Sequence, residues 1–172
     1  PPLAPEGANG CSLPGAADAP VAAEACESDG TLTGYHAAIG LIHNISRDHG
    51  EVDALRPQFE AFAKRSSRLL VNAASAEAVE LGRMVGARTY GTDPGADAKL
   101  EVDGAGPHRA CGRLLLDGGP LVLDVPQPGR HNLENAAAAA LIALELGVAP
   151  ATAAALLARF PGVARRFEVI GV

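Results

Sequence analysis

The chain has 172 residues, 48% of them hydrophobic and 20% charged, which is typical of one folded domain and unlike disordered or collagen-like sequences. The net charge is −6, and aromatic residues make up only 3% of the chain, with no tryptophan. A basic surface or aromatic platform for nucleic acid is therefore not expected. The longest apolar run, 136–144, is shorter than the roughly 20 residues of a membrane span, so no membrane partner is expected either.

The cysteines indicate a reducing compartment. Cys11, Cys26 and Cys111 form an odd set without a CxxC pair, as expected for free thiols. No basic and apolar leader opens the chain. Together these features predict a cytoplasmic protein.

The first part of the chain predicts a lead-in followed by alternating elements. Residues 1–20 are rich in proline, glycine and alanine and predict no element, so the expected organisation is this lead-in and one domain over 21–172. Residues 21–25 suggest a short strand, and the apolar run 39–45 predicts a buried parallel strand. Apolar spacing after Gly50 then predicts an amphipathic helix with Pro57 in its first turn.

The middle and end of the chain continue this alternation and then change character. Alternation of strand and helix favours a parallel sheet flanked by helices, and the Asp-Gly-Gly turn at 117–119 predicts a hairpin in a small antiparallel section. The expected elements are strands at 68–71, 87–90, 99–102, 109–116 and 120–125, and helices at 75–85 with a Ser75 cap, 129–146 ended by Gly147, and 150–160.

Carboxylates gather just after the first expected strand, at Glu24, Glu27 and Asp29. In an open α/β sheet the carboxyl edge of the strands is where ligands bind, and carboxylates suit a Mg²⁺ ion that bridges to phosphate. The alternative is a solvated acidic turn.

A second polar cluster, Asn44 to His49, follows the next expected strand and so predicts a place on the same edge. His49, beside Asp48, is a candidate metal ligand or proton carrier. A surface histidine or a helix cap is the alternative.

A third cluster, Gly129 to Asn135, opens the alanine-rich helix. Asn132 and Asn135 are three residues apart and share a helix face, where two carboxamides can pair with an adenine edge. Asn132 as a plain N-cap is the alternative.

The order of these clusters, followed by Gly-Val-Ala-Arg-Arg-Phe-Glu at 162–168, resembles the Mur ligases of peptidoglycan synthesis. The resemblance spans 21–172 and implies an α/β fold: part of the family's P-loop-type central domain, a parallel sheet flanked by helices with a small antiparallel section. The motifs look most like those of the members that add L-alanine to UDP-N-acetylmuramate. A murein tripeptide ligase of wall recycling, a non-catalytic binding module of the same family, and an unrelated α/β domain are the alternatives.

The resemblance also implies cofactors, partners and residue roles. Family members use ATP and Mg²⁺: a nucleotide-sugar carboxylate attacks the γ-phosphate, and an amino acid captures the acyl phosphate. Carried over by position, the implied roles are Glu27 and His49 as Mg²⁺ ligands, His131, Asn132 and Asn135 at the adenine, and Arg166 facing the phosphates. The UDP-N-acetylmuramate-type sugar and the amino acid would be bound through the family's flanking domains.

The resemblance breaks at the phosphate-binding loop. The chain has no Gly-Lys dipeptide, and the nearest segment, 7–12, carries Cys11 where the family has lysine. The family's flanking domains also have no counterpart within these residues. We therefore expect the chain alone to bind Mg-ATP weakly or not at all and to be inactive by itself.

Overall fold

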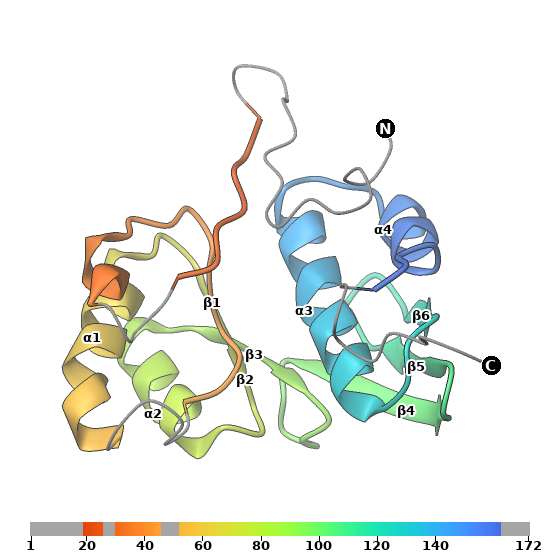
Figure 1. Ribbon diagram of the computed structural model, residues 1–172, viewed down its shortest axis with the longest axis horizontal. Coiled ribbons are helices and arrows are strands. Elements are labelled where there is room, and N and C mark those ends of the chain that lie inside the picture. Colours follow the sequence, from red (N-terminus) through yellow and green to blue (C-terminus); the bar gives the residue numbers. More distant parts are fainter. Residues whose placement is uncertain (1–18, 26–29, 46–51, 163–172) are drawn as a thin grey trace, which may run out of the picture.

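The computed structural model describes residues 19–25, 30–45 and 52–162, and in them a six-stranded sheet runs through the molecule with helices packed on it (Figure 1). The strand order is β1-β2-β3-β4-β5-β6. In chain order the elements are η1 (Thr31–Gly34), β1 (Gly40–Ile42), α1 (Val52–Arg65), β2 (Leu69–Asn72), α2 (Ala76–Val85), β3 (Arg88–Gly91), β4 (Ala98–Ala105), β5 (Ala110–Leu114), β6 (Leu121–Val125), α3 (Arg130–Glu145) and α4 (Pro150–Leu157).

The sheet changes direction at β4. Strands β1 to β4 pair in parallel, whereas β4, β5 and β6 pair antiparallel. Both the predicted parallel sheet and the predicted antiparallel section are confirmed. Because β1, β2 and β3 are parallel, the residues that follow them meet on one edge of the sheet, the lower edge in Figure 1.

Strand β2 is buried on both faces. Leu69 and Val71 pack into a cluster with α1 and α2, while Leu70 packs into the cluster under α3. Strands covered on both faces are near-continuous apolar runs, which is why 68–71 was recognisable as a strand.

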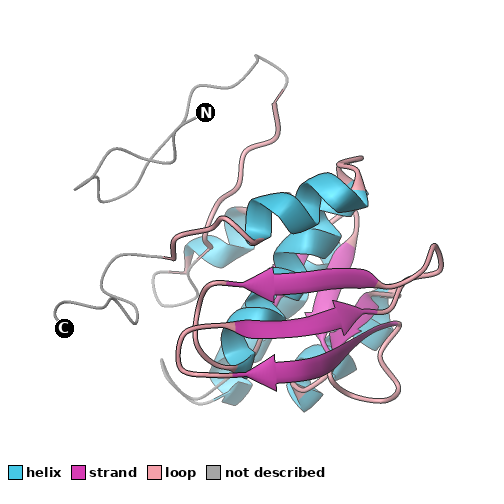
Figure 2. Ribbon diagram, turned by 90° about the vertical axis from the view of Figure 1, so that its right-hand side faces the viewer, coloured by secondary structure: helices cyan, strands magenta, loops and turns pink. Residues whose placement is uncertain are grey.

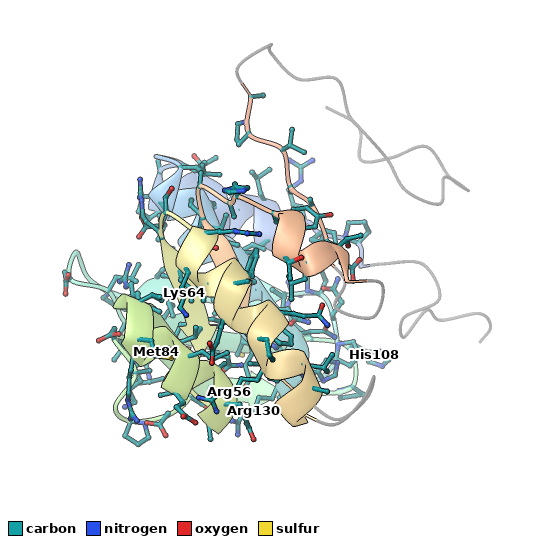
Figure 3. All side chains as sticks on the ribbon, turned by 90° about the vertical axis from the view of Figure 1, so that its left-hand side faces the viewer. Arg56, Lys64, Met84, His108 and Arg130 are labelled. Carbon is teal, nitrogen blue, oxygen red and sulfur yellow. The ribbon has the colours of Figure 1, made fainter. Side chains whose placement is uncertain are left out.

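Helices α1 and α2 cover one face and are joined by an ion pair. Arg56 of α1, labelled in Figure 3, is the cation of this pair. It lies 2.7 Å from a carboxylate oxygen of Glu80 in α2, and it also pairs with Glu60 one turn along its own helix. Hydrogen bonding to Arg56 lowers the pKa of Glu80. The pair is exposed, so its contribution to stability is small.

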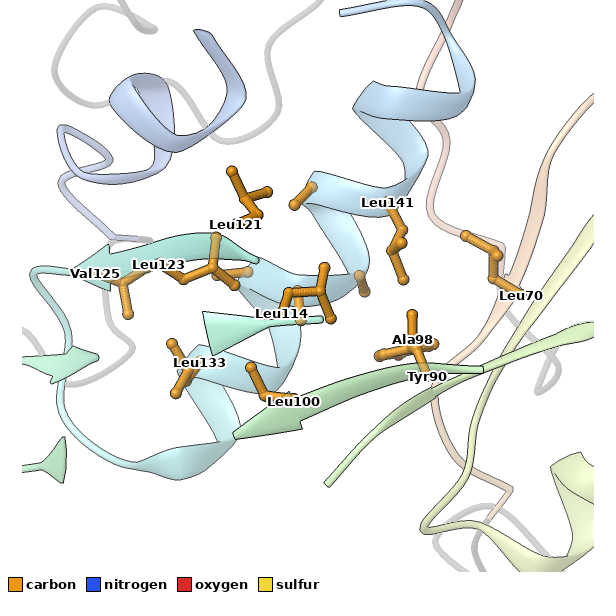
Figure 4. Close-up of a cluster of buried hydrophobic side chains, with 14 of the residues drawn as sticks. Leu70, Tyr90, Ala98, Leu100, Leu114, Leu121, Leu123, Val125, Leu133 and Leu141 are labelled. Carbon is orange, nitrogen blue, oxygen red and sulfur yellow. The ribbon is translucent and has the colours of Figure 1, made fainter. Parts of the chain in front are cut away.

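Helix α3 covers the other face and packs closely against the antiparallel strands. Leu133 is fully buried among side chains that include Leu100 of β4 and Leu114 of β5 (Figure 4). A Cβ atom at Gly112 would lie 2.3 Å from the carbonyl oxygen of Glu101 and 2.9 Å from Leu133. The core under α3 therefore needs glycine at this position of β5.

The outer face of the antiparallel section carries no helix in the described residues (Figure 2). Charged side chains alternate in sign across it: Lys99 pairs with Glu101, and Arg113 pairs with both Glu101 and Asp103. Val122, opposite Arg113 on β6, is also exposed, so this face is charged with an apolar side chain among the ion pairs.

Two predictions about local structure were wrong. Residues 21–25 form no strand, and Val21 is 90% exposed, because a strand needs a neighbour to pair with and β1, in the described sheet, pairs with β2 alone. Pro57 does not lie in the first turn of α1, because the helix already begins at Val52. The ring removes one helical hydrogen bond, and packing of Leu55 and Phe62 holds the helix together around it.

The other predicted elements are confirmed, with ends that differ by a few residues. Strand β4 extends to Ala105 instead of residue 102, whereas α4 ends at Leu157 instead of residue 160. Among the described residues, no helix is both long enough and apolar enough to cross a membrane.

Candidate functional site

A cleft of about 410 Å³ opens at the carboxyl edge of β1 and β2, against the start of α3. Its walls come from the loop after β1, the turn after β2 and the first turns of α2 and α3. The lining residues are His43, Asn44, Ile45, Asn72, Ala74, Ser75, Glu77, His131 and Glu134.

A smaller cavity of about 190 Å³ lies at the opposite, amino edge. There Glu145 at the end of α3 ion-pairs with both Arg68 and Arg88. Because these charges already satisfy one another, the carboxyl-edge cleft is the better candidate site.

The turn after β2 is held by Asn72. Its side-chain oxygen accepts a hydrogen bond from the backbone N–H of Ala74 at 3.0 Å, and the residue is only 4% exposed. Gly91 at the end of β3 has φ +127°, and a Cβ there would lie 2.8 Å from the same Asn72 oxygen. Glycine at 91 thus lets the ends of β2 and β3 approach each other.

Ser75 joins two walls of the cleft. As N-cap of α2, its hydroxyl oxygen accepts a hydrogen bond from the backbone N–H of Ala78 at 3.3 Å. The same oxygen accepts one from the N–H of Ile45, in the loop after β1, also at 3.3 Å. This serine therefore fixes the loop after β1 relative to the start of α2.

The start of α3 is tied to the end of β3. Gly129, with φ +86°, precedes the helix as its N-cap. Arg130 ion-pairs with Glu134 one turn along at 2.8 Å and donates a hydrogen bond to the hydroxyl of Thr92, just after β3. The first turn of α3 is thereby held over the edge of the sheet.

One of the residues that line the cleft, His43, is hydrogen-bonded to a buried tyrosine. Nδ1 of His43 lies 2.6 Å from the hydroxyl oxygen of Tyr90, which is fully buried in β3. Burial lowers the pKa of His43, partly offset by the nearby Glu134 carboxylate. Burial also raises the pKa of Tyr90, so both groups are neutral near pH 7.

Two of the three sequence clusters meet at this cleft. Asn44 and His131, from the second and third clusters, both line it. Asn132, also from the third cluster, donates a hydrogen bond from its carboxamide nitrogen to the carbonyl oxygen of Pro128 at 2.8 Å. It lies within the helix, so its alternative interpretation as the N-cap was wrong; Gly129 has that position.

Of the remaining predicted residues, some lie in the described ranges and others do not. Asn135 is exposed one turn into α3, and Glu24 is exposed before the first cluster. The predicted metal ligands Glu27 and His49, and Arg166, lie outside the described residues. Within the described ranges, no group of three or more His, Cys, Asp or Glu side chains is arranged to hold a metal ion.

Sequence reasoning missed three residues that line the cleft, His43, Asn72 and Glu134, and the buried Tyr90 that is hydrogen-bonded to His43. His43 and Asn72 stand at the carboxyl ends of β1 and β2, which is the signal that singled out Asn44. Polar residues at such ends are candidates by the same rule. Tyr90 carried no comparable signal, because its contact with His43 spans 47 positions of sequence.

Known proteins that are similar to this chain in sequence carry the same name. The chain is 39% identical over 162 residues to UDP-N-acetylmuramate–L-alanine ligase of Paenarthrobacter aurescens, covering 87% of this chain and 35% of that protein. It is 39% identical over 165 residues to the protein of the same name from Kineococcus radiotolerans, with 88% and 35% covered. No description of a known protein family matches the chain. The chain spans about a third of the length of these curated relatives.

Solved structures agree with these relatives. The crystal structure of UDP-N-acetylmuramate-alanine ligase MurC from Thermotoga maritima superimposes with a TM-score of 0.71 at 25% identity, over 84% of this chain and 34% of that one. MurF from Acinetobacter baumannii shows the same fold, with a TM-score of 0.71 at 21% identity over 84% and 34% of the two chains. The alternative of an unrelated α/β domain is thereby wrong. With its motif order, its sheet and these relatives in agreement, the chain belongs to the Mur ligase family.

Proposed function

We propose that this chain is the nucleotide-binding part of an ATP-dependent ligase that joins L-alanine to UDP-N-acetylmuramate in peptidoglycan synthesis. The observation that carries the proposal is the cleft in which Asn44, from the loop after β1, meets His131 at the start of α3. That cleft lies in a chain 39% identical to proteins with this ligase name. The odd number of cysteines, none in a CxxC pair, favours free thiols, so the proposal places the ligase in the cytoplasm.

The proposed reaction makes an amide from a carboxylate, which is a poor acceptor for an amine. ATP supplies the activating phosphoryl group, and catalysis of its transfer depends on positioning and on neutralising charge at phosphate oxygens. Carboxylate oxygen suits Mg²⁺, so Glu27 fits a metal site, whereas the imidazole of His49 is a softer ligand than Mg²⁺ prefers. Both residues lie outside the described ranges, and their role as Mg²⁺ ligands is proposed from the family resemblance.

The start of α3 supplies the proposed adenine contacts. Asn135 is exposed, which leaves its carboxamide available for the donor and acceptor edge of a base. One N–H of the Asn132 carboxamide already donates to the carbonyl oxygen of Pro128. The carbonyl oxygen and the second N–H of this carboxamide are the groups proposed to contact the base. His131 lines the cleft itself.

The last described residues of the chain lie beside the loop that leads into α3. Gln127, in the loop before α3, donates a hydrogen bond to the carbonyl oxygen of Phe160 at 2.6 Å. A Cβ at Gly162 would lie 3.5 Å from the same Gln127 nitrogen. Arg166 itself lies outside the described residues, and its role facing the phosphates is proposed from the family resemblance alone.

A graft tests the proposed function. Residues 19–172 replace the matching segment of the Paenarthrobacter aurescens ligase, whose own sequence is kept on both sides. We expect the grafted protein to form the amide of UDP-N-acetylmuramate with L-alanine, with one ADP released per product. Absence of product from a folded graft, with the parent enzyme active in the same assay, would overturn the proposal.

The same assay separates the alternatives in part. A matched reaction offers murein tripeptide in place of L-alanine. Transfer to the tripeptide alone would favour the wall-recycling ligase. Nucleotide binding by the graft without either product would favour the non-catalytic binding module.

A further inference from the structure

The hydrogen bond between His43 and Tyr90 fixes which nitrogen of the histidine carries the proton. The Tyr90 side chain is fully buried, and Nδ1 of His43 is the partner that the described residues provide for its hydroxyl. A buried hydroxyl must donate its proton to an acceptor or lose a hydrogen bond. If Nδ1 were the donor, the proton of the tyrosine hydroxyl would have no acceptor among the described residues. We therefore take the tyrosine as the donor and Nδ1 as the acceptor.

This assignment leaves the second nitrogen as a donor. Burial lowers the pKa of His43, so the ring is neutral at pH 7 and carries one proton. With Nδ1 accepting, that proton is on Nε2. Nε2 bonds to none of the described residues, and His43 lines the cleft.

The charges around His43 leave room for an anion. From α3, Glu134 faces it, but this carboxylate is ion-paired with Arg130 at 2.8 Å. His131 lines the cleft from the same helix, and Glu77 lines it from an exposed position in the first turn of α2. Helices α2 and α3 both begin at the cleft, and the start of a helix favours negative charge.

We propose that His43, with its tautomer fixed by Tyr90, donates the Nε2 proton to an anionic oxygen of the ligand that occupies the cleft. His43 is the contacting residue and Tyr90 is a positioning residue. The inference rests on the proposed function for the identity of the ligand: the oxygen belongs either to a phosphate of the nucleotide or to the carboxylate of the muramate substrate.

Nitrogen-15 NMR of the full chain tests the proposal without any catalytic step. At pH 7.5 we expect the Nδ1 signal of His43 to have the shift of an unprotonated nitrogen and the Nε2 signal that of a protonated one. Inorganic tripolyphosphate, N-acetylmuramic acid and adenosine are then titrated separately, up to concentrations on the order of 10 mM, because the chain without its phosphate-binding loop is expected to bind each of them weakly. Movement of the Nε2 signal with tripolyphosphate identifies the phosphate source, and movement with N-acetylmuramic acid identifies the carboxylate source.

Variants separate positioning from folding. Tyr90→Phe keeps the buried ring but removes the hydroxyl, so we expect the fixed tautomer to be lost and the dissociation constant of the anion to rise roughly threefold. His43→Ala removes the donor and is expected to weaken binding about tenfold, whereas His43→Gln retains an N–H donor and restores most of it. Tyr35→Phe, at the other tyrosine of the chain, is the matched control and is expected to change neither tautomer nor affinity.

Three results would overturn the proposal: a protonated Nδ1 in the wild-type chain, an Nε2 signal unmoved by both anions, or a response to adenosine alone. A failed graft with the expected NMR result would instead remove the ligase function and leave the anion contact standing. An active graft together with an Nε2 signal that neither anion moves would leave the ligase function standing and remove the anion contact of His43.

Discussion

The hydroxyl oxygen of Ser75 lies 3.3 Å from the backbone nitrogen of Ile45 and accepts its hydrogen bond. Ser75 is buried before α2, while Ile45 is the last described residue of the loop after β1. One side chain therefore holds together the two loops that form the sheet side of the cleft, directly before the segment that contains His49.

Replacing this serine tests that link. Ser75→Ala removes the cap of α2 and leaves the Ile45 N–H without its acceptor, so we expect the free energy of unfolding to fall by about 2 kcal/mol. Urea denaturation followed by circular dichroism measures it. Ser67→Ala, at an exposed serine, is the control and should change stability by less than about 0.5 kcal/mol. Equal effects of the two changes would contradict the role given to Ser75.

The close approach of α3 to β5 predicts a strong difference between two glycines. Gly112→Ala places a Cβ 2.3 Å from the carbonyl oxygen of Glu101, so we expect it to destabilise the fold by about 3 kcal/mol. A Cβ at Gly118, in the turn between β5 and β6, would meet no atom of a more distant residue within 4 Å, so Gly118→Ala is expected to stay within about 0.5 kcal/mol of wild type. Thermal unfolding of both variants gives the comparison, and tolerance of alanine at 112 would show that strand β4 and Leu133 of α3 do not crowd this position.

The two asparagines of α3 should behave differently. In the grafted protein, Asn135→Ala is expected to raise the KM for ATP about tenfold without lowering stability, because the side chain is exposed and its proposed partner is the base. Asn132→Ala also removes the hydrogen bond to Pro128, so a loss of about 1 kcal/mol of stability should accompany its effect on ATP. Ala139→Ser, one turn beyond Asn135 on the exposed side, is the control. An unchanged KM in Asn135→Ala would exclude this residue from the nucleotide site.

Burial of His43 predicts a pH dependence of stability. Its pKa in the folded chain lies below the reference value of 6.5, so below that pH the unfolded chain binds more protons than the folded one. The stabilising contribution is therefore complete above pH 6.5 and is lost as the pH falls below it. Denaturation is measured at about pH 7.5 and about pH 5.5. Between these pH values the free energy of unfolding should fall more for wild type than for His43→Gln, which has no titrating group at position 43. Equal losses in the two proteins would mean that His43 titrates as it does in the unfolded chain.

The sequence predicted the elements well where local signals agreed with the final packing. Ser75 gave the start of α2, and Gly147 followed the end of α3, because caps act through hydrogen bonds and dihedral angles of neighbouring residues. Residues 21–25 show the limit of such signals, since whether a short apolar run becomes a strand depends on a partner that sequence does not name.

For the candidate site, the sequence predicted its location at the carboxyl edge of the sheet but not the side-chain contacts within it. The rule that ligands bind where parallel strands end pointed to Asn44, and the helix-start motif pointed to His131, which line the same cleft. The pairing of His43 with Tyr90 and the ion pair that neutralises Glu134 depend on how α3 crosses the sheet, which local sequence does not specify. All the roles carried over by position stay predictions: Glu27 and His49 at Mg²⁺, Arg166 at the phosphates, and His131, Asn132 and Asn135 at the adenine.

The central claim is that Glu27 and His49 lie at the same edge of the sheet, and thiol cross-linking measures this most directly. Glu27→Cys and His49→Cys are combined in a chain whose Cys11, Cys26 and Cys111 are replaced by serine, and a short bismaleimide is added to the folded protein. A control pairs Glu27→Cys with Ser67→Cys, which lies at the amino edge. We predict an intrachain cross-link between positions 27 and 49, identified by mass spectrometry, and none between 27 and 67; cross-linking of the control pair in preference to the first would contradict the claim.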